Sequence, residues 1–308
     1  MKAFRSHLLS QAPMLWVALM PLLAQAQSAP AAGKSTLGIA AITPTASLKQ
    51  TVDKAGKTLS LGQVVESLDS QLMDRFNATR KFELVSRSDL ASVIKEQDLG
   101  GSGNLDARSV ARIGELTGAK HILVTTVDNF QDITRKEELK IQKEVLTARE
   151  IRLSAVGKIY VTQSGKLLES ANFQTATNKL VTEFATASVE GNRTDDLLVA
   201  IARDTADKIA NRVADVIFPA RVLTKREKQI MINRGDGTGV ALGQVWNVFA
   251  VGEELLDPDT KESLGREEVL VGKARVVSIQ PKTATAELFE DNGVAVGAVL
   301  RRPAGISP

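Results

Sequence analysis

The chain has 308 residues, a length that suits roughly two domains, and 43% of its residues are hydrophobic, enough to build their cores. It contains no cysteine, which excludes disulfide bonds and the cysteine that a lipid anchor requires. The formal net charge is only +3 and aromatic residues make up 4%, so the composition argues against a nucleic-acid-binding surface.

The first 26 residues have the pattern of a secretory signal peptide. Lys2 and Arg5 precede an apolar stretch shorter than the roughly 20 residues of a spanning helix, and an A-x-A cleavage site ends at Ala26. We expect cleavage between Ala26 and Gln27, which lowers the formal net charge from +3 to +1, and a periplasmic mature protein. Residues 27–35 are small and polar and predict a flexible leader.

The next segment opens with a β-like run from Thr36, and we expect a polar loop with Gly56 and Gly62 after it. A helix is predicted over 63–78, because apolar residues recur there at steps of three and four. Its expected buried face consists of Val65, Leu68, Leu72 and Phe76. The run KFELVS predicts a short strand, and the next helix is expected to be capped by Ser86 or Ser88, to bury Leu90, Val93 and Ile94, and to end at Gly100-Gly101.

Two more helices and three strands are predicted before residue 219. The segment NLDARSVARIGELTGAK predicts a helix between Asp106 and Gly118 that leads into the strand HILVTTVDNF. Two further strands are expected across 149–176, joined at Ser164-Gly165, and a long helix from Thr194 is closed by Pro219. Expected buried residues of these two helices are Val110, Ile113, Leu116, Leu198, Ile201, Thr205, Ile209, Val213 and Val216. The irregular alternation predicts an α+β domain over 36–219.

After Pro219 the helical periodicity stops. Five short β-like runs follow, separated by glycine, proline and aspartate: QIMIN, QVWNVFAV, EVLVGKARVVSI, TATAELF and VGAVLRR. Ala284, Ala286 and Leu288 alternate with polar residues, as in a half-buried strand. This pattern predicts a small all-β barrel or sandwich over 221–304.

The stretch INRGDGTGVALGQVW, which begins at Ile232, contains four glycines between the β-like runs. It lacks the Gly-Lys-Ser/Thr of a phosphate-binding loop, and no helical pattern follows it, so we expect the glycines to supply positive φ between strands. Arg234-Gly235-Asp236 matches an adhesion tripeptide, but a turn explains the same letters. Neither Gly33-Lys34-Ser35 nor Gly56-Lys57-Thr58 has the earlier glycine of a phosphate loop.

The remaining motifs do not combine into a catalytic or metal site. Ser92 and Lys95 fit the S-x-x-K of penicillin-recognising enzymes, but the companion motifs of that family are missing. His121 begins a predicted strand, and Asp257-Pro258-Asp259 is expected to form a hairpin turn instead of a calcium loop. The mixed charges of Arg135 to Lys143 predict a solvated helix or hairpin tip. We therefore expect no catalytic residues, no cofactor and no metal.

The stretch KFELVSRSDLASVIKEQDLGGSGNLDARSVARIGELTGAKHILVTTVDNF resembles the CsgG-like superfamily. This superfamily includes the curli secretion channel CsgG, the penicillin-binding-protein activator LpoB and the middle domain of the flagellar ring protein FlgT. Its marks here are the FELVSR strand and the helix-to-strand passage from Ala111 to Val124. The glycine-rich stretch is similar to the turn of the β-rich C-terminal domain of FlgT. The resemblance implies a CsgG-like mixed sheet with packed helices, followed by a small barrel-like domain.

These features predict a non-catalytic, periplasmic envelope-assembly or accessory protein that acts by protein–protein interaction, with a homo-oligomeric ring as one form and no nucleic acid or lipid anchor among its partners. The alternative that the resemblance leaves open is a curli-type secretion channel subunit at the outer membrane, or a cell-wall synthase activator. CsgG-type channels insert β-hairpins into the membrane, which requires alternation of apolar residues along each strand. The matching regions, TRKEELKIQKEVLTAREIRL and NKLVTEFATASVEGNRT, carry charges on both faces and argue against a pore.

Overall fold

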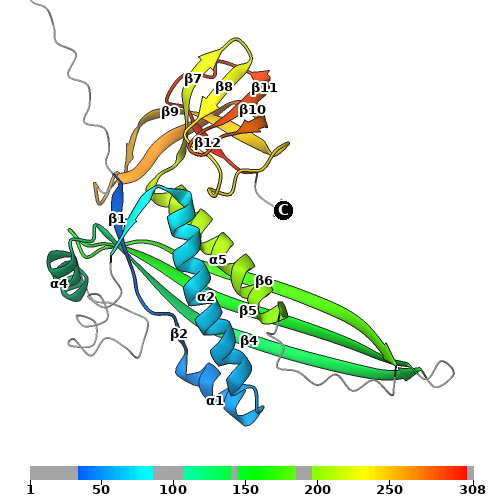
Figure 1. The fold of residues 1–308 in the computed structure, drawn as a ribbon. Helices are drawn as coiled ribbons and strands as arrows, with labels where there is room; N and C mark the ends of the chain where they lie inside the picture. Colours follow the sequence, from blue (N-terminus) through cyan, green and yellow to red (C-terminus); the bar gives the residue numbers. More distant parts are fainter. Residues whose placement is uncertain (1–33, 86–106, 140–143, 185–195, 262, 304–308) are drawn as a thin grey trace, which may run out of the picture. The chain divides into compact units, whose positions relative to one another are not determined.

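The computed structural model describes residues 34–85, 107–139, 144–184, 196–261 and 263–303 (Figure 1). The expected cleavage site at Ala26 and Gln27, the leader and the helix expected near Ser86 or Ser88 lie outside the described residues. Ser92 and Lys95 lie outside them too.

The first part of the fold is a mixed sheet of six strands. Its order is β3-β1-β4-β5-β6, with β2 paired to β4. The strands β1, β2 and β3 join the sheet in parallel, whereas β4, β5 and β6 form an antiparallel meander. Their bounds are β1 Ser35–Ile39, β2 Thr43–Pro44, β3 Phe82–Leu84, β4 His121–Leu139, β5 Glu144–Val161 and β6 Leu167–Phe184.

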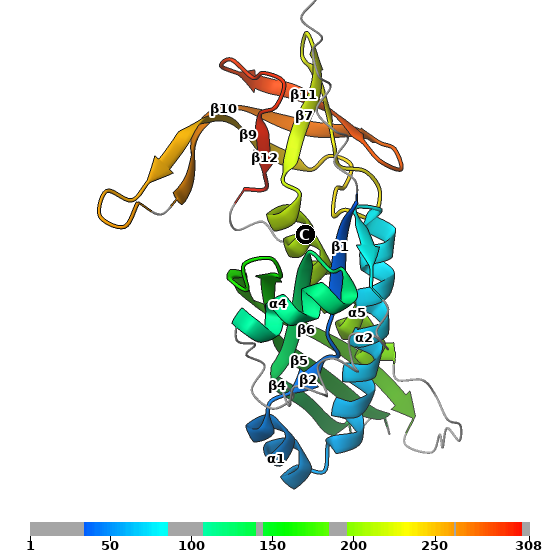
Figure 2. The same ribbon diagram turned by 90° about the vertical axis from the view of Figure 1, so that its left-hand side faces the viewer.

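Four helices of the described chain pack on this sheet. The two long ones, α2 and α5, lie side by side on one face of β4, β5 and β6 (Figure 1). Helix α4 covers the opposite face, since Val110 and Ile113 cluster with Ile122 and Tyr160 (Figure 2). The bounds are α1 Ala46–Lys54, α2 Thr58–Thr79, α4 Ala107–Thr117 and α5 Asp196–Ile217. The α+β class predicted from the sequence is confirmed.

The alternation of side chains along β4 explains how one strand serves two cores. Leu123 and Val127 are fully buried beneath α2 and α5, while Ile122 and Val124 turn to the side of α4. A strand that buries both faces contains nearly continuous apolar residues, as the run HILVTTV does.

The prediction of a polar loop around Gly56 and Gly62 was wrong. Helix α1 and the first turn of α2 occupy this region, and Gly62 lies inside α2. The pattern of α1 was too weak to predict a helix, because only Leu48 and Val52 are buried in it. Its start is fixed instead by Thr45, whose Oγ1 accepts a hydrogen bond from the backbone N–H of Leu48 at 3.3 Å.

Three expected core residues also differ from the structure. In α2 the fully buried valine is Val64, and Val65 is only partly buried at the margin of the core, as is Val216 of α5. In α4 Leu116 is 59% exposed, although Val110 and Ile113 are buried as predicted. Gly118 ends α4 at φ +68°, as predicted, and Gly165 turns the chain between β5 and β6 at φ +67°.

The second part of the fold consists of six antiparallel strands. Their pairings run β10-β11-β8-β7-β12-β9, and β9 pairs with β10 in turn, so the ladder closes into a ring. The predicted barrel-like all-β part is thus confirmed, with one strand more than the five runs foresaw. That strand is β7, whose sequence ARVLTKR buries only Ala220 and Val222. The bounds are β7 Ala220–Arg226, β8 Gln229–Ile232, β9 Val245–Leu256, β10 Ser263–Ile279, β11 Ala284–Asp291 and β12 Val299–Arg301.

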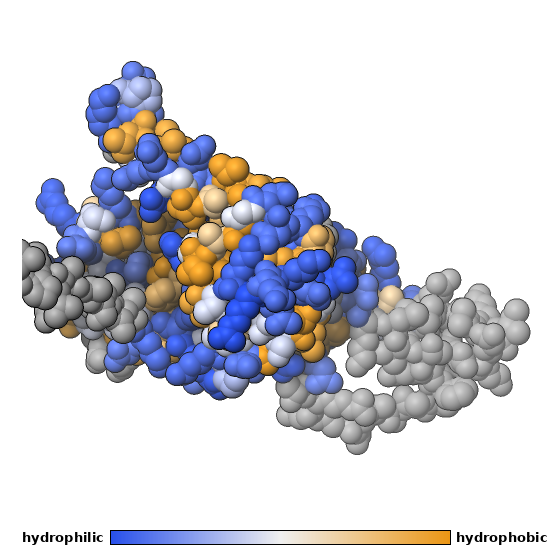
Figure 3. Space-filling model, turned by 90° about the horizontal axis from the view of Figure 1, so that it is seen from above, coloured by the Kyte–Doolittle hydropathy of each residue, from blue (hydrophilic) through white to orange (hydrophobic). Residues whose placement is uncertain are grey.

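The core of the β part is small and mostly aliphatic. Trp246 is its largest side chain, and Ala284, Ala286 and Leu288 alternate into it as predicted. Seen from above, apolar groups interrupt the hydrophilic surface (Figure 3). Exposed large apolar side chains of this part include Val277, Phe289 and Val296.

The strands β9 and β10 continue past this core as a two-stranded ribbon, which we define as residues 251–270 (Figure 2). Within the described residues, β9 pairs with β12 only over 247–249 and β10 pairs with β11 only over 272–279, so the ribbon has no other strand beside it. At its tip, Asp257 Oδ1 accepts hydrogen bonds from the N–H groups of Asp259 and Thr260 at 2.8 and 2.9 Å. Asp257-Pro258-Asp259 forms the expected turn.

Candidate functional site

The glycine-rich loop between β8 and β9, residues 233–244, does more than turn the chain. Gly237, Gly239 and Gly243 have φ values of +75°, +73° and +77°, as expected for glycines that supply positive φ. Gly237 also passes against the end of α2, where an added Cβ would lie 2.7 Å from the carbonyl oxygen of Ala78. The loop therefore needs glycine both for its backbone conformation and for close packing.

Arg234, in the same loop, is completely buried, with 0% of its surface exposed. Its Nη2 atom donates to the carbonyl oxygens of Ala214 and Phe218 at 3.1 and 2.6 Å, and to Asp215 Oδ1 at 2.6 Å. Burial lowers the pKa of this guanidinium, while the Asp215 carboxylate opposes that shift. An Arg-Gly-Asp adhesion ligand must present its arginine to a receptor, so the burial of Arg234 removes that interpretation.

The position of Arg234 follows from the way a helix ends. The last carbonyl oxygens of α5 have no partner within the helix, and the aligned peptide dipoles place partial negative charge there. A cation that donates to these oxygens satisfies both needs. Arg234 thus fixes the end of α5 to the glycine-rich loop.

A row of alternating charges continues from Arg234. Asp215 Oδ2 accepts a hydrogen bond from Arg302 Nη2 at 2.6 Å, so the carboxylate is shared by two arginines. The guanidinium of Arg302 lies 5.6 Å from the centre of the Trp246 ring, a cation–π distance. Trp246 in turn donates from Nε1 to Gln244 Oε1 at 3.1 Å. We call Arg234, Asp215, Arg302 and Trp246 the charged row.

Lys81 meets the glycine-rich loop from the side of β3. Its Nζ donates to the carbonyl oxygen of Asn233 at 2.7 Å. Burial is the main cause that lowers the pKa of Lys81, and the nearby charge of Arg234 lowers it further. This ammonium therefore acts as a hydrogen-bond donor to the backbone and has no carboxylate partner in the described chain.

An open groove of about 700 Å³ borders the charged row. Helix α5, strand β6 and the strands β7, β9 and β12 contribute to its walls. Charged and polar side chains dominate, and the lining includes Asp207, Lys208, Arg212, Asp215, Arg301 and Arg302.

The charges of this groove are largely neutralised within the chain. Arg212 pairs with Glu169, and Arg301 holds both carboxylate oxygens of Glu268 at 2.6 Å. Burial raises the pKa of Asp207, although Arg75 lies 2.9 Å from it. Among the described residues that line the groove, none is a nucleophile paired with a base.

Other titratable groups of interest lie in the first sheet. His121 is the first residue of β4, as expected, and its Nδ1 is 3.0 Å from Ser35 Oγ. Burial, then the charge of Lys120, lowers the pKa of His121. Asp132 is held by both Arg149 Nε and Nη2 at 2.8 Å, and these bonds lower its pKa despite burial.

Among the described residues there is no cluster of three His, Cys, Asp or Glu side chains that could hold a metal ion. None of the described helices has the length and apolar character needed to cross a bilayer. Sequence reasoning found the glycine-rich loop but missed Arg234 and Asp215. The only hint was an arginine inside a β-turn pattern, which does not reveal that the side chain points inward.

Comparison with known families locates the resemblance. The family model of the curli production assembly/transport component CsgG matches residues 22–138. Among curated proteins, none matches this sequence. The expected CsgG-like character is confirmed for the matched segment, which contains β1, β2 and β3, all but the last residue of β4, and three of the helices described above.

Several solved structures are similar to part of the chain. The hypothetical protein CT253 of Chlamydia trachomatis is 10% identical, with a TM-score of 0.37, and the match covers 60% of this chain and 98% of that one. Lipoprotein GNA1162 of Neisseria meningitidis is 13% identical, with a TM-score of 0.29 and coverage of 57% and 99%. The C-terminal domain of Escherichia coli LpoB is 14% identical, with a TM-score of 0.22 and coverage of 46% and 82%. Likenesses at this level carry no argument about function.

Proposed function

We propose that this chain is a non-catalytic accessory protein of the bacterial cell envelope, which acts by binding other proteins. The observation that carries this proposal is the match of the CsgG family model to residues 22–138, since that family is described by a role in assembly and transport.

The chemistry of the described residues supports a binding role. The groove beside the charged row has its arginines paired to carboxylates of the same chain, and it presents no activated nucleophile. Binding proteins use exposed side chains of this kind without needing a strained or strongly shifted catalytic group.

The proposal places the mature chain in the periplasm. The pattern Lys2, Arg5 and the A-x-A site ending at Ala26 supports export and cleavage before Gln27. N-terminal sequencing of the protein from a periplasmic extract is expected to begin at Gln27. A full-length chain in the cytoplasm would contradict this part of the proposal.

In-cell crosslinking tests the function itself. The chain is tagged at its C-terminus, the envelope is crosslinked before lysis, and the joined proteins are identified by mass spectrometry. We expect crosslinks to components of an envelope-assembly machine. Turnover of a cell-wall or nucleotide substrate by the purified chain would overturn the non-catalytic role.

A secretion-channel subunit is the second candidate, and the length of three strands favours it. β4, β5 and β6 contain 19, 18 and 18 residues, more than the 9 to 11 or so that cross a bilayer as a strand. Against it, Arg135, Lys136, Arg149 and Arg152 place charges along these strands. Extraction of the native protein by buffer without detergent would exclude the channel, and recovery only as a detergent-extracted ring would favour it over the accessory role.

A further inference from the structure

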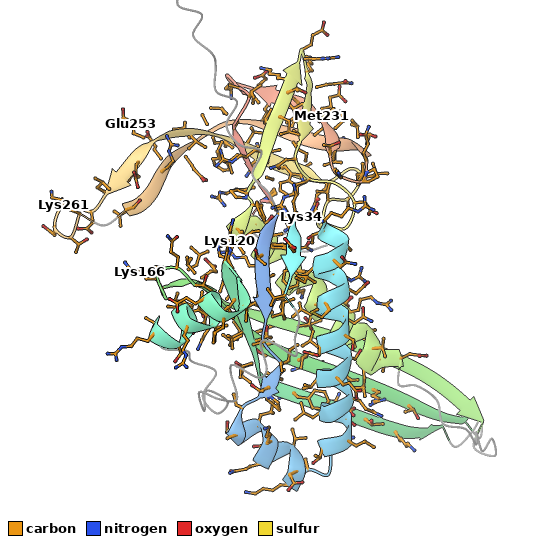
Figure 4. The ribbon with its side chains drawn as sticks, turned by 60° about the vertical axis from the view of Figure 1, so that its left-hand side comes forward. Lys34, Lys120, Lys166, Met231, Glu253 and Lys261 are labelled. Atoms are coloured by element: carbon orange, nitrogen blue, oxygen red, sulfur yellow. The ribbon has the colours of Figure 1, made fainter. Side chains whose placement is uncertain are left out.

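The ribbon carries a strong negative charge on a basic chain. Residues 251–268 contain seven acidic and two basic residues, a net charge of −5, whereas the whole sequence has +3. After the expected loss of Lys2 and Arg5 the mature chain has a net charge of +1, so its remainder outside the ribbon has a net charge of +6. Glu253 (Figure 4) and Glu267 on the ribbon are exposed and take part in no ion pair within the described residues.

The ribbon is also apolar where it is most exposed. Leu255, Leu256 and Leu264 are 48%, 54% and 65% exposed near its tip. A two-stranded ribbon alone is at best marginally stable in water, and its leucines gain nothing from staying there. These features indicate a surface that a partner covers.

Helix α4 offers the complementary surface. Arg108, Arg112 and Leu116 follow one another at four-residue steps and form one stripe along the helix, and all three are exposed. Lys120, three residues after the end of α4, and the turn residue Lys166, which follows Gly165 near Ala107, add two exposed cations (Figure 4). We call this surface the α4 face.

The cations of the α4 face have no carboxylate partner within the described residues. Neither Arg108 nor Arg112 belongs to any of the ion pairs that the described chain forms, and the same holds for Lys120 and Lys166. This differs from the groove, where Arg212, Arg301 and Arg302 are paired. Leu167, next to Lys166, is 49% exposed and extends the apolar part of the face.

We propose that the acidic ribbon of one copy of this chain docks on the basic α4 face of a second copy. Charge complementarity is the first argument, since unpaired glutamates meet unpaired arginines. The second is the order of side chains on one face, because Glu253 precedes Leu255 by the two-residue step that keeps both on one face of β9, just as Arg108 and Arg112 precede Leu116 on α4. The lengths also agree: six residues of β9 span about 20 Å, and the 11 residues of α4 span about 16 Å.

Strand addition at the ribbon edge is a poorer alternative. The pairing of β9 with β10 has register shifts between Ser263 and Gly265, between Arg266 and Glu268, and between Leu270 and Gly272. Such irregularities, together with charged side chains, disfavour the pairing of another strand along an edge. The ribbon is therefore suited to contacts through its side chains.

The proposed contact joins two different surfaces, so it is heterologous and leads to a ring or an open chain of copies. It goes beyond the proposed function, because it concerns contact between copies of this chain and not binding of another envelope protein. Its test uses the purified chain alone, so its failure would leave the envelope partners of the proposed function untouched.

Because the sequence has no cysteine, engineered cysteines can report the contact directly. One full-length chain carries Glu253→Cys and a larger tag, and a second carries Arg112→Cys. The two are mixed under mild oxidation, and the products are separated by size and identified by mass. We expect a mixed disulfide between the two chains at least tenfold above that formed with Lys49→Cys, an exposed position on α1.

Equal yields with Arg112→Cys and Lys49→Cys would overturn the proposal. A chain carrying both Glu253→Cys and Arg112→Cys that closes only within itself would overturn it as well, since the ribbon would then lie on its own α4. Far-UV circular dichroism of each variant checks that the fold is retained.

Charge reversal gives an independent test by sedimentation. The variant E253K/E267K and the variant R108E/R112E are each expected to associate about tenfold more weakly than the original chain, because attraction becomes repulsion. Mixed together, the two variants are expected to associate again, because the first keeps the basic α4 face and the second keeps the acidic ribbon. The quadruple variant also restores opposite charges and is expected to regain association. Failure of the quadruple variant to recover, with intact folding, would contradict the proposal.

An anionic membrane surface could use the same cations. Vesicles of neutral and anionic phospholipid are therefore mixed with the original chain and with R108E/R112E. If R108E/R112E abolishes binding to anionic vesicles and leaves self-association unchanged, the α4 face serves lipid and the proposal is wrong. No difference in vesicle binding, together with weaker association, supports it.

Discussion

The end of α5 contains charged side chains that are paired with one another, whereas the ribbon exposes charged side chains that include glutamates without an ion pair in the described residues. At the end of α5, Arg234 is wholly buried and its charge is balanced by Asp215 and two carbonyl oxygens of the same chain. On the ribbon, Glu253 and Glu267 are exposed and have no ion pair within the described residues. The first arrangement uses charge to join elements of one chain, whereas the second leaves charge available to another molecule.

This difference has a physical basis in solvation. A buried ion must be paired and hydrogen-bonded, because its removal from water otherwise costs on the order of several kcal/mol. An exposed carboxylate remains hydrated at little cost, and pairing it at the surface contributes about 1 kcal/mol or less. Mutations at the two places are therefore expected to affect different quantities, stability at the first and association at the second.

Replacing Arg234 should have the largest effect on stability. Arg234→Ala is expected to lower the free energy of unfolding by about 3 to 5 kcal/mol, because it leaves the α5 carbonyls without a donor and opens a cavity. Urea unfolding followed by circular dichroism measures this. Arg301→Ala, at a half-exposed pair with Glu268, is the control and should cost about 1 kcal/mol or less. Equal losses would show that burial of Arg234 is not what matters.

Asp132 extends the comparison to the first sheet, where its side chain is 1% exposed. Asp132→Asn is expected to destabilise the fold by about 2 kcal/mol at pH 7, because Arg149 loses a charged acceptor. The pKa of Asp132 is lowered in the folded chain, chiefly by its bond to Arg149, so this stability is present above the unfolded pKa of about 3.9. It is lost as the pH falls through the folded pKa. The difference in the free energy of unfolding between the original protein and Asp132→Asn should therefore shrink below about pH 4. Urea unfolding at several pH values measures it, and a difference that stays constant with pH would show that the ionised carboxylate is not the source of this stability.

The two glycines Gly237 and Gly243 separate backbone strain from close packing. Both have positive φ, but an added Cβ meets Ala78 only at Gly237, and nothing lies within 4 Å at Gly243. Gly243→Ala should cost about 1 kcal/mol, from the backbone alone. Gly237→Ala should cost about 1 kcal/mol more, because the loop must move away from the end of α2. Thermal unfolding of both variants checks this. Equal decreases in Tm would mean that the loop moves away from Ala78 at no cost in stability.

Changes on the ribbon should have the smallest effect on stability. The double variant L255S/L256S removes side chains that are about half exposed, so unfolding should change by no more than about 0.5 kcal/mol. Self-association, measured by sedimentation, should fall clearly in the same variant. A large loss of stability instead would mean that these leucines are buried within the single chain.

Much of the fold could be predicted because the sequence pattern and the burial pattern agree. Leu198, Ile201 and Ile209 recur at helical steps and are all buried in α5. Ala284 and Ala286 alternate as a strand requires. In such elements one face meets a core, so periodicity alone identifies them.

The elements that were missed have few buried residues. Helix α1 buries two residues, and strand β7 buries Ala220 and Val222 among charged neighbours. Their conformation depends on contacts with distant segments, which local propensity does not contain. Leu116 shows the converse, since it continues the helical period of α4 but lies on the exposed side.

The candidate site was predictable only in part. The loop glycines could be assigned positive φ from their spacing, and three of them have it. The inward direction of Arg234 could not be assigned, because it depends on where α5 ends in space. The carbonyl oxygen of Phe218 that accepts from Arg234 lies 16 residues earlier in the chain, and local sequence does not show that the two meet. The predicted division at residues 219 to 221, the cleavage site and the partners stay predictions.

The link between Arg234 and Asp215 constrains the order in which these positions can change during evolution. If Asp215 is replaced first, a fully buried guanidinium loses its carboxylate and must remain charged in the interior. If Arg234 is replaced first by an uncharged residue, Asp215 still pairs with Arg302 and retains access to water. Lineages that abandon this pair should therefore lose the arginine before the aspartate, and sequences with Arg234 but without Asp215 should be rare intermediates.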